Sequence, residues 1–164
     1  MISLRQDIFA EDALKIADWL EDEDILVYLN EEKNISKSIR SLVKISNMPI
    51  YNQVFNKKGN FYLIYLEEEP IGFVKFIPKK ESHEIVITIG EKKLWGNGYG
   101  KKALKKALCE AFLSNRYSRI NAKIKNLNSR SLAMFEHLGF DMELERNDTV
   151  HLSMDFKAFL KKAA

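Results

Sequence analysis

The most informative segment of the chain reads Leu94-Trp95-Gly96-Asn97-Gly98-Tyr99-Gly100-Lys101-Lys102-Ala103-Leu104. Three glycines alternate with other residues, and a helical pattern begins directly after them. Glycine adopts backbone conformations that side chains disfavour, and it lets a ligand approach the main chain without meeting a Cβ atom. Unpaired N–H groups at a helix N-terminus, together with the helix dipole, attract anions. The segment therefore predicts a loop that binds a phosphate group.

Two lysines at the start of this helix favour the same interpretation. Lys101 and Lys102 lie in its first turn, where the helix dipole disfavours cations unless an anion lies nearby. A tight turn with solvated lysines is the alternative that needs no ligand. A P-loop would require Ser or Thr after Gly100-Lys101, where Lys102 stands. A dinucleotide-binding loop would require an acidic residue about 20 residues further on, and the region around Asn121 has none.

Hydrophobic periodicity extends the prediction over the rest of the chain. The predicted strands cover residues 2–6, 61–66, 71–77, 84–89, 119–125, 140–146 and 149–156, and the predicted helices cover residues 10–29, 35–46, 99–114 and 129–138. Antiparallel strands come first, followed by a strand–helix–strand crossover and a final hairpin. This order predicts a single α/β (α+β) domain over residues 1–164, with a mixed, mostly antiparallel sheet of about seven strands flanked by about four helices.

Composition and charge exclude several classes of function. Hydrophobic residues make up 46% and charged residues 30%, as in globular domains, and the formal net charge is +3. No apolar run approaches the ~20 residues that span a bilayer, so we expect no membrane partner. The basic residues form no broad patch interleaved with aromatics, so we expect no nucleic-acid partner.

Three smaller features concern location and metals. The first residues lack the apolar run of a secretory signal, so we expect a cytoplasmic protein. Cys109, the one cysteine, falls on the apolar side of the helix predicted over residues 99–114, and we expect it in the core. The three histidines are scattered, so no metal site is predicted.

A second informative segment follows the strand predicted over residues 119–125. It reads Asn128-Ser129-Arg130-Ser131-Leu132-Ala133-Met134-Phe135-Glu136-His137-Leu138-Gly139-Phe140. Asn128 suits a helix N-cap, and Gly139 suits the left-handed residue that ends many helices. A capped amphipathic helix explains each residue separately, but it does not explain why this helix comes one strand after the glycine loop.

Together the two segments resemble the GNAT superfamily of acyltransferases. Trp95-x-x-Gly98-x-Gly100 is similar to the family's pyrophosphate-binding pattern Gln/Arg-x-x-Gly-x-Gly/Ala. The second segment is similar to the family's Asn-x-x-Ser/Ala-x-x-x-Tyr-Glu-Lys-x-Gly-Phe, with Phe135 in place of the Tyr. Trp95 replaces the first Gln or Arg. The form Trp-Gly-x-Gly-Tyr-Gly resembles the branch of ribosomal-protein-alanine and spermidine acetyltransferases.

The resemblance implies acetyl-CoA as the cofactor. It places the pantetheine arm along the strand that leads to Gly90, and the pyrophosphate on backbone N–H groups between Trp95 and Lys101. Backbone N–H groups near Thr88 or Ile89 are the implied oxyanion donors. The implied cofactor-binding residues are Ile87, Thr88, Ile89, Gly90, Trp95, Gly96, Asn97, Gly98, Tyr99, Gly100, Lys101, Asn128, Ser131 and Phe135.

Acetyl transfer to an amine also needs a base for the ammonium proton and a proton source for the thiolate. Glu84 is the candidate catalytic base, because related enzymes often place a Glu at the start of this strand; an ordinary strand-end carboxylate is the alternative. His83, which points to the other face of a regular strand, is the second candidate. Phe135 has no proton to give, so Ser131, one turn earlier on the same helix face, is the candidate catalytic acid, unless the thiolate needs none.

The first two predicted helices are expected to form the acceptor site. Trp19, Tyr28 and Tyr51 are candidate pocket aromatics, although each also suits the core. The run Glu21-Asp22-Glu23-Asp24 can attract a polyamine, an aminoglycoside or a basic protein N-terminus, or it can be a solvated helix end.

The resemblance thus predicts acetyl transfer from acetyl-CoA to a primary amine of a small molecule or of a protein N-terminus. The departures at Trp95 and Phe135 leave a second function open, a catalytically weak acyl-CoA-binding sensor or interaction module on the same fold. The sequence also leaves a homodimer open.

Overall fold

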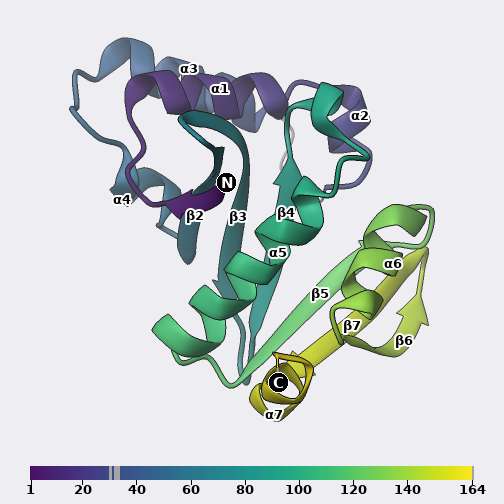
Figure 1. The fold of residues 1–164 in the computed structure, drawn as a ribbon. Helices are drawn as coiled ribbons and strands as arrows, with labels where there is room; N and C mark the ends of the chain where they lie inside the picture. The colour runs from purple at the N-terminus through teal and green to yellow at the C-terminus, as the bar shows by residue number, and fades with distance from the viewer. Residues whose placement is uncertain (30, 32–33, 164) are drawn as a thin grey trace.

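The computed structural model describes residues 1–29, 31 and 34–163, and Figure 1 shows its fold. The strands are β1 (Ile2–Arg5), β2 (Asn60–Leu66), β3 (Glu69–Pro78), β4 (His83–Ile89), β5 (Arg119–Lys125), β6 (Asp141–Arg146) and β7 (Thr149–Asp155). The helices are α1 (Ala10–Trp19), α2 (Glu23–Leu26), α3 (Ile35–Ile45), α4 (Asn52–Phe55), α5 (Tyr99–Cys109), α6 (Ser129–His137) and α7 (Phe156–Ala163), with a 3₁₀ turn η1 (Lys92–Leu94) and a π-helical turn η2 (Glu110–Ser114).

Within the described residues, the strands form one seven-stranded sheet in the order β1-β2-β3-β4-β5-β7-β6. The pairs on either side of β4–β5 are antiparallel, and β4–β5 is parallel. The predicted α/β (α+β) class with a mixed, mostly antiparallel sheet is therefore confirmed.

The parallel pairing of β4 and β5 is short. It contains two residue pairs, His83 with Ile120 and Glu84 with Asn121. Beyond Glu84 the two strands diverge, as Figure 1 shows. The edge of β4 that faces β5 is consequently left without a strand partner over most of its length, and its backbone groups must find other partners.

Helices cover both faces of the sheet. On one face, Leu104 of α5 belongs to the same buried cluster as Ile85 of β4. On the other face, Ile16 of α1 clusters with Phe73 of β3, and Val86 packs against this second cluster. Successive residues of β4 thus point to opposite faces, as in any regular strand.

The helix predicted over residues 10–29 is interrupted, so the prediction of one continuous helix is wrong. α1 ends at Trp19, and α2 begins after Asp22, whose carboxylate accepts a hydrogen bond from the Asp24 N–H at 2.9 Å. This cap starts a new helix because it satisfies one of the N–H groups that a helix leaves unpaired at its N-terminus. Hydrophobic periodicity does not reveal such an internal cap.

Two further details differ from the prediction. Cys109 is exposed and does not belong to the core, because the buried stripe of α5 runs through Ala103, Leu104, Ala107 and Leu108 and leaves the next residue outside it. The helix α7, which was not predicted, follows β7. Its Phe159 is buried and stacks on Phe112 with ring centroids 4.9 Å apart. A segment of eight residues shows too few helical turns for periodicity to identify it.

Candidate active site

The divergence of β4 and β5 contributes to a cavity of about 810 Å³. The cavity is lined by β4, by the glycine loop, by α6 and by residues beside α2. Most of the predicted site residues line it: Glu84, Ile87, Thr88, Ile89, Trp95, Gly96, Gly98, Tyr99, Gly100, Lys101, Asn128, Ser131 and Phe135. Two predicted residues, Gly90 and Asn97, do not. The cavity thus brings together residues that are far apart in the sequence, such as Glu84 and Phe135, which are 51 positions apart.

The glycine loop has the backbone that its sequence suggests. Gly96 and Gly98 adopt φ angles of +82° and +81°, a region that side chains disfavour. A Cβ atom added at either position would meet no other atom within 4 Å, so open space lies beside both glycines. Gly98 is the N-cap of α5 and offers no side chain to the first-turn N–H groups. The loop therefore fits an anion such as the pyrophosphate of a CoA cofactor.

Trp95 and Asn97 hold this loop in place. The Trp95 indole donates a hydrogen bond to the Ile89 carbonyl at 2.8 Å, which joins the loop to the end of β4. The Asn97 side-chain amide donates to the carbonyls of Leu94 and Trp95 at 3.0 and 3.3 Å. The hydrogen-bond donors of both side chains are therefore already paired with carbonyls of the protein. Trp95 thus braces the loop where the family pattern has a residue that can donate to the pyrophosphate.

Gly90 has a packing role. Its N–H donates to the Ile71 carbonyl at 2.7 Å, so this N–H is already paired with β3. A Cβ atom at Gly90 would lie 2.2 Å from the indole ring of Trp19. The glycine is required because Trp19, a buried core residue, packs directly on its backbone.

The hydrogen bonds at the end of β4 define which backbone groups face the gap. The Gly90 N–H points to β3, and the Ile89 carbonyl points away from β3 to Trp95. Backbone groups of successive strand residues alternate in direction, and the β3–β4 register has no irregularity. Alternation therefore directs the N–H groups of Ile87 and Ile89 toward the gap and that of Thr88 toward β3.

α6 begins at the cavity with the predicted cap. The Asn128 Oδ1 accepts a hydrogen bond from the Ser131 N–H at 3.2 Å. Ser131 lines the cavity in the first turn, and Phe135 follows one turn later. Phe135 is buried and packs edge-on against Phe140, with ring centroids 4.9 Å apart. Its ring belongs to both the core and the cavity wall.

Glu84 lies where β4 and β5 part. Its side chain is 15% exposed, and its Oε1 lies 3.4 Å from Lys123 Nζ and 3.6 Å from Lys79 Nζ. His83, the second candidate base, does not line the cavity. Its ring stacks on Tyr117 with centroids 3.6 Å apart, and burial lowers the pKa of His83. The structure therefore brings Glu84, and not His83, to the cavity.

Sequence reasoning missed an ion pair in the cavity wall. Lys75 of β3 lies 2.5 Å from a carboxylate oxygen of Glu31, and both side chains are largely buried. A lysine within an apolar central strand was the available signal, since such a residue must find a partner. Of the three candidate aromatics, Tyr28 lines the cavity, whereas Trp19 and Tyr51 are core residues.

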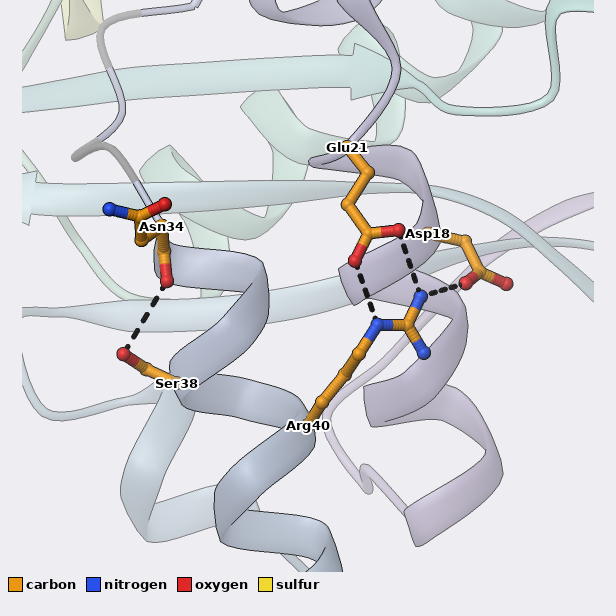
Figure 2. Close-up of polar contacts among 5 residues, drawn as sticks. All are labelled: Asp18, Glu21, Asn34, Ser38 and Arg40. Atoms are coloured by element: carbon orange, nitrogen blue, oxygen red, sulfur yellow. Dashed lines mark hydrogen bonds and ion pairs between the residues drawn. The ribbon is translucent and has the colours of Figure 1, made fainter.

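The acidic run beside α2 is held by cations of the protein itself. Figure 2 shows the guanidinium of Arg40 between two carboxylates. Its nitrogens donate to Glu21 at 2.7 and 3.1 Å and also to Asp18. The hydrogen bond from Arg40 lowers the pKa of Glu21. The carboxylates in turn raise the pKa of Arg40.

Lys92 pairs with two further carboxylates of this run. Its Nζ lies 2.9 Å from a carboxylate oxygen of Asp22 and 2.9 Å from one of Asp24. This contact lowers the pKa of Asp22 and raises that of Lys92. Since Lys92 lies directly before the glycine loop, the pair also ties the start of α2 to that loop.

Two features are absent from the residues that the structure describes. Nowhere in residues 1–29, 31 and 34–163 do three or more His, Cys, Asp or Glu side chains gather in a way that could hold a metal ion. None of the helices in these ranges has the length and apolar character needed to cross a membrane.

Comparison with protein families identifies the class. The family model described as "Acetyltransferase (GNAT) domain" matches residues 4–141. The chain therefore belongs to the GNAT acetyltransferase family and is an acyltransferase, and the family's donor is acetyl-CoA. No curated protein matches the sequence. The more specific branch of ribosomal-protein-alanine and spermidine acetyltransferases is not established by this match.

Solved structures share the fold at low sequence identity. A domain from Methanocaldococcus jannaschii DSM 2661 is 22% identical, with a TM-score of 0.73 over 94% of this chain and 98% of that one. The aminoglycoside acetyltransferase AAC(6')-Ib in complex with coenzyme A is 16% identical, with a TM-score of 0.79 over 100% of both chains. Spermidine N-acetyltransferase from Vibrio cholerae, in complex with CoA and spermine, is 18% identical, with a TM-score of 0.78 over 97% of this chain and 98% of that one.

Proposed function

We propose that this protein transfers the acetyl group of acetyl-CoA directly to a primary amine of a small molecule or of a protein N-terminus. One observation carries the proposal: the uncapped N-terminus of α5, with its open glycine loop, and the carboxylate of Glu84 line the same cavity. An anion site and a candidate base in one cavity are what an acetyl-CoA-dependent amine acetylation needs.

The proposed cofactor site uses the loop and the free edge of β4. The N–H groups from Gly96 to Lys101 hold the pyrophosphate, with the first turn of α5 adding its dipole. The Trp95 N–H is already paired, because it donates to the Lys92 carbonyl at 3.0 Å. Ile87 and Ile89 offer backbone groups to the pantetheine arm, and their N–H groups stabilise negative charge on the acyl oxygen. Alternation along β4 supports Ile89 over Thr88 in this second role.

Bound acetyl-CoA supplies an acetyl thioester, whose C–S bond breaks as the acetyl carbon forms a C–N bond with the amine. Glu84, directly or through a water, removes one proton from the ammonium and passes it to solvent. The second amine proton goes to the thiolate sulfur. Ser131, which lines the cavity one turn before Phe135, is the side chain we propose to relay it.

A thiol-release assay tests this function. The protein is mixed with acetyl-CoA and, separately, with an amino acid, spermidine, an aminoglycoside or a peptide with a free N-terminus. Release of CoA thiol that depends on the amine, with the acetylated amine identified by mass spectrometry, is the expected result. Tight CoA binding without thiol release for any amine would favour the sensor function instead. The observation that favours this second function is that Phe135 has no hydroxyl with which to protonate the thiolate.

The lysines at the start of α5 predict a salt effect on cofactor binding. Lys101 lines the cavity and Lys102 follows it, so both should attract the cofactor's phosphates through contacts that salt screens. CoA affinity, measured by calorimetry from 50 to 500 mM salt, should fall less steeply in the double variant Lys101→Ala, Lys102→Ala than in the wild type. The control is the double variant Lys105→Ala, Lys106→Ala one turn later. Equal salt slopes in all three proteins would make the first pair solvated bystanders.

Other sequence-based expectations remain predictions. We infer that residues 1–164 act as one acetyltransferase domain and that the protein is cytoplasmic. The resemblance to ribosomal-protein-alanine and spermidine acetyltransferases supports an amine acceptor but does not choose among amines.

A further inference from the structure

A second, smaller cavity borders Glu84. Its volume is about 180 Å³, small beside the ~300–1,000 Å³ of pockets for drug-sized ligands. It is lined by Lys79, Glu84, Asn121, Ala122, Lys123, Glu143, His151 and Leu152. Glu84, Ala122 and Lys123 line the main cavity as well. The candidate base therefore lies between the acetyl-transfer cavity and a small polar one.

Two lysines and two glutamates line the small cavity, and Arg119 adds a third cation from beside it. Lys79 and Lys123 both contact Glu84, so two cations share this carboxylate. Glu143, the other carboxylate of the wall, is already paired: Arg119 and Ser153 both donate hydrogen bonds to it. These two contacts lower the pKa of Glu143. Because Arg119 engages Glu143, the two lysines have only Glu84 between them, and an added anion would give the second lysine a partner.

The Lys123 side chain is exposed enough, and its contact with Glu84 long enough, for it to exchange Glu84 for another anion. Its side chain is 42% exposed, and its Nζ lies 3.4 Å from Glu84, longer than a good charge-assisted hydrogen bond of about 2.7–2.9 Å. An incoming ammonium can take the place of Lys123 beside Glu84, provided that Lys123 then meets an anion. A ligand that carries both charges satisfies both groups and leaves no charge without a partner.

A polycationic acceptor fits these walls less well. Glu31, a carboxylate of the main cavity wall, is engaged with Lys75, and outside the cavity Glu21 is engaged with Arg40 and Asp22 with Lys92. A second ammonium near Glu84 would also face the charges of Lys79 and Lys123, and like charges in a partly buried site repel strongly.

We propose that the acceptor is an α-amino carboxylate, whose ammonium lies at Glu84 and whose carboxylate lies in the small cavity against Lys123 and Lys79. One carbon separates the two groups of such a molecule, which suits two opposite charges 3.4 Å apart. This inference rests on the proposed amine acetylation and names its substrate class. Lys123 binds the substrate and sets specificity.

A matched set of amines tests the substrate class. L-Leucine, L-leucinamide and isopentylamine share one side chain and differ in the group beside the amine, while spermidine represents the polycations. We expect kcat/KM for L-leucine to exceed that of each of the other three at least about tenfold, the scale of one hydrogen bond to a charged group. Equal use of L-leucine and L-leucinamide, or a preference for spermidine, overturns the proposal and leaves the acetyltransferase function intact.

Variants at two lysines of β5 distinguish a loss of substrate binding from a general effect on the structure of the strand. Lys123→Ala should raise the KM for L-leucine about tenfold and change that for L-leucinamide less than threefold. Lys125→Ala, on the same strand face and outside both cavities, is the control and should change neither. A Lys123→Ala variant that weakens both substrates equally overturns the proposed contact, and Lys123→Gln repeats the test with a longer side chain.

A binding measurement tests the anion subsite even if the protein shows no acetyltransferase activity. If no amine is acetylated, the proposed function fails, and calorimetry of L-leucine and L-leucinamide with the CoA complex decides the subsite separately. Binding of L-leucine that is tighter than that of the amide, and that Lys123→Ala removes, supports the anion subsite. Equal binding of the two ligands, or no binding of either, refutes it.

Discussion

Glu84→Gln is expected to lower kcat/KM about 100-fold at neutral pH, the low end of what acid–base catalysis contributes. The amide has nearly the shape of the carboxylate but cannot accept the ammonium proton. Because free amine becomes available as pH rises, the loss should shrink toward alkaline pH. CoA affinity should stay unchanged, since the side chain is placed away from the glycine loop. The measurement is a pH profile of kcat/KM for variant and wild type with one amine.

The control for this experiment is Glu81→Gln. Glu81 is exposed in the turn before β4 and lines neither cavity, so its loss should leave the profile unchanged. If Glu84→Gln retains wild-type kcat/KM at every pH, Glu84 has no part in proton transfer. The proton would then leave through water held by backbone carbonyls.

Gly98→Val is expected to weaken CoA binding roughly 10- to 100-fold, the loss of about one hydrogen bond to a charged group at about 1.5–3 kcal/mol. A side chain there enters the open space beside the loop, and a β-branched residue at φ +81° is strained besides. Gly98→Asn, which tolerates the left-handed region, should weaken binding less. Calorimetry with CoA gives the affinities, and thermal unfolding gives the cost in stability.

The variant Asn147→Val serves as a control that distinguishes the effect of backbone strain from the effect of a side chain that blocks the cofactor. Asn147 lies in the β6–β7 turn with φ +47°, outside both cavities, so its variant carries comparable backbone strain far from the loop. We expect a lower melting temperature with unchanged CoA affinity. If Gly98→Val keeps full CoA affinity in a folded protein, the pyrophosphate does not lie at this loop.

Much of the proposed cofactor site was predictable because its signals are local. The left-handed glycines Gly96 and Gly98, the helix that starts at Tyr99 and the cap at Asn128 each depend on neighbours within a few residues. Side-chain direction was less predictable. Gly90 and Asn97 belong to the same segment and do not line the cavity: Gly90 packs against Trp19, and the Asn97 side chain donates to carbonyls of its own loop.

The proposed acceptor side was not predictable in the same way. Its contacts join residues that are far apart in sequence, such as Glu31 and Lys75, separated by 44 positions, or Lys92 and Asp24, separated by 68. The acidic run could be expected to attract a cation, but nothing local indicated that Arg40 and Lys92 would be its partners. Which charges remain available to a ligand depends on the packing of α1, α2 and α3.

The fold class, the left-handed glycines of the loop and the family could be predicted from the amino-acid sequence alone, because strand patterns, glycine conformations and helix caps arise from short-range interactions. Three features became visible only in the folded chain: β4 and β5 part at Glu84, the Trp95 indole N–H donates to the Ile89 carbonyl, and two lysines share one carboxylate beside a second cavity. These features could not be predicted because charge pairing and cavity shape are set by long-range packing. The position of each charged side chain depends on all the elements that lie between it and its partner in the sequence.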